Sequence, residues 1–341
     1  MNEIAVKRQT ALKSIKLNGK YHNYRRFKMM EHGFWSMMKE MVSSKTVRAP
    51  KTALDYAQIN PDSLFSGKDD QLRATLLGHS SFILELDGAK IMLDPVLFPD
   101  VSPVSWVFSV KRFQKQSPLL PKDVPQIDVV IISHDHYDHL DKKTVKAIHH
   151  KVGRFVVPIG IDEYLKKWGV PAAKITTLDW SENVQIGQTI ITALPAQHFS
   201  GRGLVGREKT LWASWSIQGP HHNVYFSGDT GYQECFKTIG ERFGPFDMVF
   251  LDTGQYSKNW PWVHMFPEQS VQAFLGLKGK WYIPMHWGSF NLSPHNWFDP
   301  IEGAIQVAKD KQVEIVVTYP GKTIVFGEDR PQTEWWMQYK K

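Results

Sequence analysis

Four side chains of metal-binding type occur within six consecutive residues of this chain: His134, His136, Asp138 and His139. They directly follow residues 128–133, an apolar run typical of a buried strand, so they occupy the strand's end and the loop beyond it. In such a loop His134 and His136 share a face, whereas Asp138 and His139 can turn toward a neighbouring centre. The spacing therefore favours two divalent metal ions. Imidazole and carboxylate ligands suit Zn²⁺, with Mn²⁺ and Fe²⁺ as alternatives.

Two metals need more than four ligands, and three later residues are placed to supply them. His198, Asp229 and His286 each follow a predicted strand, where a rigid element gives way to a loop. A pair of metals lowers the pKa of a bridging water, and the resulting hydroxide is the expected nucleophile. No serine or cysteine nucleophile is then required, and the single cysteine, Cys235, is interpreted as a small buried hydrophobic residue.

Carboxylates commonly orient metal-bound imidazoles, and three aspartates are candidates by position. Asp94 and Asp252 follow predicted strands, and Asp141 closes the histidine motif. Turn or helix-cap roles are the alternatives for all three. His79 follows Gly78 at a predicted turn, so it either orients the metal loop or only shapes the turn.

The elements that must position these residues alternate between strand runs and helices. Two rounds of strands followed by helices predict an α/β fold of αββα type, with two mixed sheets face to face and helices outside. The expected strands are residues 73–77, 81–86, 90–93, 128–133, 154–158, 188–194, 211–218, 223–227, 247–251, 281–285, 314–318 and 323–326. The expected helices are residues 142–150, 162–168, 267–277 and 300–309.

We predict three regions: a basic, partly helical extension over residues 1–70, a catalytic domain over 71–330 and a tail over 331–341. Residues 1–60 hold 12 Lys/Arg and 4 Asp/Glu, a net charge of +8, whereas the chain as a whole carries +7. Such an extension could meet anionic lipid head groups, or it is simply a solvated arm. Residues 34–38 could form a short amphipathic helix. No apolar run approaches the length of a membrane span, and no secretory signal is visible, so we expect a cytoplasmic protein, with the inner membrane face as a site of peripheral contact.

The chain also resembles a known family, and the segments that carry the resemblance extend over roughly residues 72–330. They are residues 77–81 (LGHSS), 93–95 (LDP), 111–113 (KRF), 132–141 (ISHDHYDHLD), 178–180 (LDW), 197–198 (QH), 212–216 (WASWS), 228–232 (GDTGY), 242–247 (RFGPFD) and 286–290 (HWGSF). The chain is similar to the N-acyl-phosphatidylethanolamine-hydrolysing phospholipase D family and its bacterial relatives, within the metallo-β-lactamase superfamily.

This resemblance implies a ligand arrangement. His134, His136 and His198 would hold one metal; Asp138, His139 and His286 would hold the other, and Asp229 would bridge both. The resemblance also places a histidine at His264, which could donate to a phosphate oxygen or protonate the leaving group. A satisfied surface histidine is the alternative. Asp138, Asp229 and His264 are therefore the expected catalytic residues.

Two segments depart from the mammalian enzyme of that family, and both are expected to line the substrate entrance. They are the glycine-rich, basic residues 199–207 and the aromatic residues 256–262. Within them Arg202, Tyr256 and Trp260 are candidate substrate contacts, together with His264.

The resemblance implies a metal-dependent hydrolase of phospholipase D type acting on N-acyl-phosphatidylethanolamine-like glycerophospholipids. A lactonase that opens a small, phosphorylated sugar lactone is the alternative, because the same hydroxide can attack a carbonyl. A nucleic-acid-processing hydrolase is a remote third hypothesis. It is disfavoured because the basic charge lies in the first 60 residues: the chain carries +7 and residues 1–60 carry +8, so residues 61–341 have a net charge of −1. We thus expect a phospholipid or small anionic substrate, peripheral membrane contact, no nucleic-acid partner, and a homo-oligomer, as is common in the family.

Overall fold

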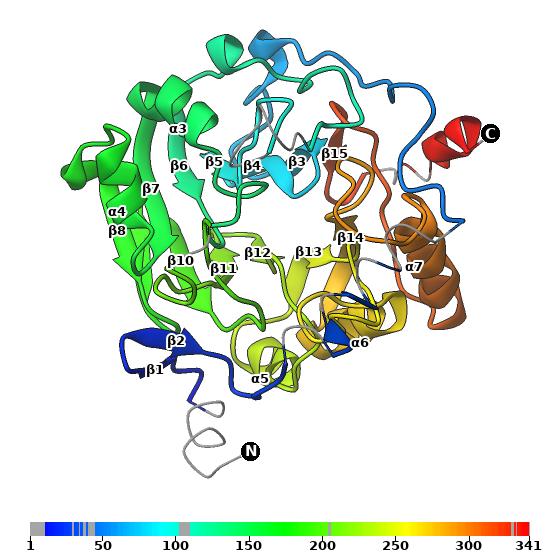
Figure 1. Ribbon diagram of the computed structural model, residues 1–341. Helices are drawn as coiled ribbons and strands as arrows, with labels where there is room; N and C mark the ends of the chain where they lie inside the picture. The colour runs from blue at the N-terminus through cyan, green and yellow to red at the C-terminus, as the bar shows by residue number, and fades with distance from the viewer. Residues whose placement is uncertain are drawn as a thin grey trace.

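Two β-sheets stack face to face, with helices against both outer faces, in the computed structural model (Figure 1). The structure describes residues 11–28, 31–33, 35, 36, 39, 45–101, 110–203, 206–328, 331 and 333–340. Side chains from the inner faces of both sheets form one continuous apolar cluster between them. The predicted αββα arrangement is therefore confirmed.

The first sheet has seven strands in the order β15-β3-β4-β5-β6-β7-β8, antiparallel from β15 to β5 and parallel from β5 to β8. Its strands are β3 (Leu72–Gly78), β4 (Ser81–Leu86), β5 (Ala89–Leu93), β6 (Ile127–Ile131), β7 (Val152–Pro158), β8 (Ile175–Leu178) and β15 (Thr323–Val325). The apolar runs in β4, β6 and β7 are buried on both faces, as expected for strands covered by helices on one side and by a sheet on the other.

The second sheet has six strands in the order β14-β13-β12-β11-β10-β9. They are β9 (Asn183–Ile186), β10 (Thr189–Leu194), β11 (Ser214–Gln218), β12 (Asn223–Phe226), β13 (Phe246–Asp252) and β14 (Gly279–Met285). The pairs β12–β13 and β13–β14 are parallel, so their carboxyl ends open at one edge of the sheet. That edge receives the residues that follow β12 and β14, which include Asp229 and His286.

The helices pack as two outer layers. Apolar side chains of α3 and α4 share a cluster with the outer face of the first sheet, and those of α5, α6 and α7 share another with the second sheet (Figure 1). The helices are α3 (Lys142–Ile148), α4 (Asp162–Lys167), α5 (Cys235–Arg242), α6 (Pro267–Leu277) and α7 (Asp299–Asp310). Short 3₁₀ turns are η1 (Pro61–Ser63), η2 (Pro121–Asp123), η3 (His149–Lys151), η4 (Ala172–Lys174) and η5 (Trp335–Tyr339). In the described part of the chain no helix is long and apolar enough to cross a bilayer.

Both predicted flanking regions contribute to the packed interior. A hairpin of β1 (Ile15–Leu17) and β2 (Lys20–His22) places Ile15 and Tyr21 in the cluster between the sheets. At the other end Trp336, in η5, is 1% exposed and donates from Nε1 to Glu302 Oε1 at 3.1 Å. The proposed boundaries at residues 70 and 330 stay predictions.

The helix expected over residues 34–38 is only partly visible. Trp35 and Ser36 are helical, and the side chain of Trp35 is 82% exposed. Phe34, Met37 and Met38 lie outside the described residues.

The strand expected over residues 314–318 is wrong. Ile315 and Val317 stand in isolated bridges and not in a strand; at the bridge of Ile315 with β14, Tyr282 N donates to Glu314 O at 2.8 Å and Val316 N donates to Tyr282 O at 2.8 Å. The next bond of a parallel ladder would need a backbone N–H at residue 284, which is proline and has none. The bridge between Ile315 and Tyr282 therefore does not extend into a continuous parallel ladder.

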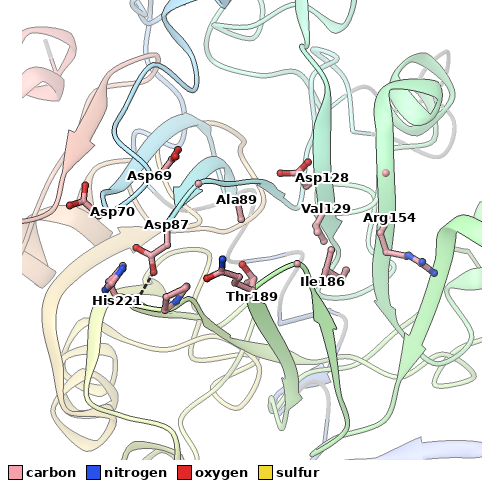
Figure 2. A pocket seen from close by; sticks show the side chains of 15 residues that line it. Asp69, Asp70, Asp87, Ala89, Asp128, Val129, Arg154, Ile186, Thr189 and His221 are labelled. Atoms are coloured by element: carbon pink, nitrogen blue, oxygen red, sulfur yellow. Dashed lines mark hydrogen bonds between the residues drawn. The ribbon is translucent and has the colours of Figure 1, made fainter.

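The strand ends far from the histidine motif border a cavity of about 930 Å³ (Figure 2). Ala89, Asp128 and Thr189, which stand at or near the start of β5, β6 and β10, line it. Figure 2 shows Asp87 turned toward His221, whose backbone N–H it accepts at 2.8 Å. Asp128 similarly accepts the backbone N–H of Lys90 at 2.9 Å. The carboxylates of Asp87 and Asp128 thus hold backbone segments of the fold in place.

Candidate metal centre

One group of inward-facing side chains gathers at the carboxyl ends of β6, β10 and β12. His136 Nδ1 lies 2.9 Å from His134 Nε2 and 3.1 Å from His198 Nε2. Asp229 Oδ2 lies 3.6 Å from His134 Nε2 and 3.7 Å from His198 Nε2. One ligand atom from each of these four residues lies within 4.8 Å of the others, which is close enough for all four to contact a single ion.

A second group lies next to the first. Asp138 Oδ2 is 3.6 Å from His139 Nε2 and 3.4 Å from His286 Nε2. It also contacts His79 Nε2 at 2.8 Å, so His79 reaches the metal loop, which is one of the two roles that the sequence left open for it. One ligand atom from each of these four residues also lies within 4.8 Å of the others.

Asp229 stands between the two groups. Besides its contacts with His134 and His198, its Oδ1 lies 3.0 Å from His139 Nε2, and its Oδ2 lies 3.3 Å from His286 Nε2. The chain thus brings together all seven residues that the sequence nominated as ligands. Four come from one loop after β6, and three come from the second sheet.

Hydrogen bonds on the outer sides of the rings determine which nitrogen faces the centre. His198 Nδ1 lies 3.0 Å from the carbonyl oxygen of Val263, and His139 Nδ1 lies 2.7 Å from Asp94 Oδ2. A carbonyl or carboxylate oxygen only accepts, so each Nδ1 carries the hydrogen. In the neutral ring Nε2 then presents a lone pair toward the interior. Converging imidazole lone pairs and carboxylates are the donor set of a zinc-type site, so these residues fit a bound divalent metal.

Burial and charge set the protonation of the metal-free site. Burial raises the pKa of Asp138 and Asp229, but nearby histidines outweigh it and hold both pKa values well below the usual range. Burial lowers the pKa of His286, but Asp229 and Asp252 outweigh it and raise its pKa to about 10. Without a metal, protons on imidazoles such as His286 therefore balance the buried carboxylates.

Asp94 organises two of the imidazoles. It is fully buried after β5, contacts His139 Nδ1, and accepts hydrogen bonds from Ser133 N at 2.7 Å and from Ser133 Oγ at 2.5 Å. The same Ser133 hydroxyl lies 2.9 Å from His134 Nδ1 and accepts its hydrogen. The orienting position predicted for Asp94 is thus the one in which the structure places it.

Asp252 contacts two more histidines. Its Oδ2 lies 2.8 Å from His264 Nδ1, and its Oδ1 lies 3.3 Å from His286 Nδ1. Asp141, by contrast, caps α3, accepting from Lys143 N and Thr144 N at 3.0 Å each. Of the three candidate aspartates, Asp141 is the one that the structure uses as a helix cap.

A cavity of about 280 Å³ opens onto both groups. Its lining consists of His136, Asp138, His198, Phe199, Arg207, Asp229, Gln255, Trp260, Val263, His264, His286 and Leu292. Arg207 is the one lysine or arginine in that lining, as far as the described residues go. Gln255, Val263 and Leu292 were not foreseen, because a single amide or aliphatic residue in a loop has no distinctive sequence signal.

The four candidate substrate residues divide into two pairs. His264 and Trp260 line the cavity, whereas Tyr256 and Arg202 are absent from its described lining. The ring of Tyr256 packs 4.7 Å from those of Phe266 and His295.

Arg202 serves the histidine loop instead. Its guanidinium donates to Asp135 O at 2.7 Å and to Leu140 O at 2.6 Å, and it lies 4.0 Å over the ring of Tyr137. These contacts join the histidine motif, from Asp135 to Leu140, to the glycine-rich loop.

The chain is similar to several known proteins. Residues 90–287 match the family model described as the beta-lactamase superfamily domain. An uncharacterised protein of Mycobacterium tuberculosis is 39% identical over 292 residues, covering 84% of this chain and 76% of that one. The N-acyl-phosphatidylethanolamine-hydrolyzing phospholipase D 1 of Caenorhabditis elegans is 35% identical over 259 residues, covering 72% of each chain. Among solved structures, Igni18, a metallo hydrolase of Ignicoccus hospitalis, superposes with a TM-score of 0.56 at 23% identity, over 76% of this chain and 100% of that one.

Proposed function

The chain belongs to the beta-lactamase superfamily and is a metal-dependent hydrolase, and we propose that it cleaves the phosphodiester bond of an N-acyl-phosphatidylethanolamine-like glycerophospholipid by means of two metal ions. The observation that carries the proposal is the position of Asp229, within 3.7 Å of imidazoles from both groups. A single carboxylate so placed can be shared by two ions. The likeness to the nematode phospholipase D supports the choice of a phospholipid.

In this proposal the ligands divide as the two groups do. His134, His136 and His198 would hold one ion. Asp138, His139 and His286 would hold the other, and Asp229 would be shared between them. Five imidazoles and two carboxylates favour Zn²⁺ over harder ions such as Mg²⁺. Divalent ions supply Lewis acidity here, which makes a water molecule acidic enough to attack near neutral pH and draws charge from a phosphoryl oxygen.

His264 is the proposed proton donor. Its Nδ1 is held by Asp252 at 2.8 Å, and the ring lines the cavity, 5.2 Å from that of His198 and 5.0 Å from that of His286. Water loses one proton to solvent as its oxygen adds to phosphorus, the bond from phosphorus to the leaving oxygen breaks, and that oxygen keeps the electron pair. His264, with Asp252 stabilising its positive ring, gives its Nε2 proton to the leaving oxygen and takes up a proton from solvent before the next turnover.

Replacement of His264 by alanine should lower kcat about 10²- to 10⁴-fold, the usual contribution of a positioned acid. Metal content should stay at the wild-type value, because the ring is assigned to substrate and not to a metal. His150, an exposed histidine in η3, gives the matched control: its replacement by alanine should leave kcat unchanged. A His264→Ala enzyme with kcat within threefold of wild type would remove His264 from the mechanism.

The cavity also limits how the substrate can bind. A volume of about 280 Å³ is just below the range of sites that enclose drug-sized ligands, so it can hold a phosphate with its glycerol but not two acyl chains. The acyl chains would leave past Phe199, Trp260 and Leu292, the apolar side chains of the lining. Arg207 is placed to pair with a phosphate oxygen.

The same small volume, with one arginine in the lining, favours a second candidate, a phosphorylated sugar lactone. The attacked atom would then be a carbonyl carbon, and the ring oxygen would be the leaving group. In that case Arg207 would pair with the phosphate of the sugar, away from the reacting bond.

Both candidates can be tested on the purified, metal-loaded protein. We expect release of phosphatidic acid and N-acylethanolamine from N-acyl-phosphatidylethanolamine in mixed micelles, detected by mass spectrometry. Opening of a sugar-phosphate lactone without any phospholipid cleavage would replace the first candidate by the second. A preparation that binds fewer than two metals per chain after metal-replete expression would contradict both.

A further inference from the structure

A segment near the N-terminus contacts both loops that border the small cavity. Residues 20–28 and 31, the described parts of the stretch from β2 onward, are called the N-terminal strap below. One loop, residues 198–210, carries His198, Phe199 and Arg207; the other, residues 255–264, carries Trp260 and His264.

The first contact of the strap is with the backbone of His198 itself. Asn23 Nδ2 donates to His198 O at 2.7 Å, and His198 N donates to Asn23 Oδ1 at 3.1 Å. A side-chain amide thus satisfies both backbone groups of one residue, 175 positions away. Because the ring of His198 is held at Nδ1 by Val263 O, backbone and ring are each fixed by a different part of the chain.

A second set of contacts reaches the far end of the same loop. Tyr21 N donates to Glu208 O at 2.8 Å, and Lys20 Nζ lies 3.2 Å from Glu208 Oε2. Glu208 N in turn donates to Ser200 O at 3.0 Å, which closes the loop that presents Phe199 and Arg207.

A third set reaches the other loop. Glu31 N donates to Asn259 O at 2.8 Å, and Trp262 Nε1 donates to Glu31 Oε1 at 2.6 Å. The guanidinium of Arg25 lies 3.8 Å over the ring of Trp262, which is within the range of a cation–π contact. The strap therefore joins the two walls of the cavity.

The strap has a firm base on the inter-sheet core. Tyr21 and Tyr24 are 3% and 7% exposed, and the Tyr24 ring packs edge-on against Trp180 at 5.2 Å. Tyr24 OH also donates to Lys13 O at 2.9 Å. A base of this kind lets Asn23, which lies between the two tyrosines, act as a fixed point for His198.

We propose that Asn23 is a positioning residue for His198, and that the N-terminal strap thereby sets the metal affinity of the centre formed with His134 and His136. The inference rests on the proposed role of His198 as a ligand. Asn23 touches neither metal nor substrate; it acts by holding the backbone from which the His198 ring projects. Loss of a residue that orients a ligand typically weakens metal binding 10- to 100-fold.

The test is a Zn²⁺ titration of the full-length, metal-depleted protein against a chromophoric chelator. Asn23→Ala should weaken one of two sites about 10- to 100-fold and leave the other within twofold of wild type. Asn23→Asp, which keeps the acceptor but sets a carboxylate against His198 O, should weaken the same site at least as much. Asn183, an exposed asparagine in β9, provides the control, and Asn183→Ala should leave both sites unchanged.

His198→Ala and Glu31→Gln complete the design. If His198→Ala still binds two ions, the proposed ligand role is wrong, whatever Asn23 does. If His198→Ala loses one ion but Asn23→Ala binds both as wild type does, the positioning role is wrong and the proposed function stands. Glu31→Gln, which removes the charge of the oxygen that accepts from Trp262 Nε1, should leave Zn²⁺ affinity within twofold. An equal loss of Zn²⁺ affinity in Glu31→Gln would show that the strap acts through general stability and not through Asn23.

Discussion

Asp229→Ala is expected to abolish hydrolysis and to reduce bound metal from two ions per chain to one or none. Asp229 is 3% exposed and lies within 3.7 Å of four imidazoles, two from each group. Asp94 also lies near one imidazole of each group, His134 and His139, but it contacts His139 at Nδ1, the nitrogen that points away from the centre. Removal of a single preorganised electrostatic contact in an active site commonly costs 10²- to 10³-fold in rate. Loss of a shared metal ligand should cost more, so we expect a decrease of at least about 10³-fold.

The measurement is kcat together with metal content by elemental analysis. Asp229→Asn, which keeps the shape but removes the charge, should behave almost as severely. Asp310→Ala at the exposed end of α7 should keep wild-type rate and metal content. Two ions per chain and a rate within tenfold of wild type in Asp229→Ala would contradict the shared-ligand role.

Arg112→Met is expected to lower the free energy of unfolding by about 2–5 kcal/mol, which is large for one side chain. Arg112 is 5% exposed, and its guanidinium donates to Leu77 O at 2.9 Å and to Val96 O at 2.5 Å. Burial lowers its pKa to about 10, so the group is still charged at neutral pH. Methionine fills a similar length but donates no hydrogen bond, so two buried carbonyl groups lose their partner.

The effect should extend to the metal centre. Leu77 immediately precedes the turn that carries His79, and Val96 lies two residues beyond Asp94, so Arg112 joins the backbone segments on which both residues stand. Denaturant unfolding followed by tryptophan fluorescence gives the free energy. Arg242→Met, at an exposed arginine in α5, should change it by no more than about 0.5 kcal/mol. A loss below 1 kcal/mol for Arg112→Met would mean that the two carbonyls find other donors.

Much of the fold can be predicted from local sequence patterns. The elements that such patterns do not predict are missed for physical reasons. The apolar runs of β4, β6 and β7 are predictable from the sequence, because burial on both faces leaves a largely apolar segment. Helix α5 was missed because Thr238 and Gly240 lower helix propensity in only eight residues. It forms because Cys235, Phe236 and Ile239 pack against the second sheet, a tertiary contribution that a short window does not contain.

The candidate site divides in the same manner. Histidines and aspartates at strand ends can be recognised in the sequence as candidate ligands. All seven predicted ligands lie close together in the structure. Arg202 is basic and lies in a glycine-rich segment, and these two features predict a contact with substrate. In the structure its hydrogen-bond partners are two backbone carbonyls of the histidine loop. The contact between Asn23 and His198 joins residues 175 positions apart through an ordinary amide, so no spacing rule could have indicated it.

The glycine-rich loop is attached at both of its ends, and this has a consequence for how such a protein can diversify. At the start, Gly201 N donates to Asp135 Oδ1 at 2.7 Å, and Arg202 bonds the histidine motif; at the end, Glu208 bonds Ser200 and Tyr21. The stretch between Arg202 and Glu208 can therefore change in sequence or length while the ligand geometry is inherited intact. Recombination or laboratory grafting at that stretch is the simplest route to new substrate preferences with an unchanged metal centre.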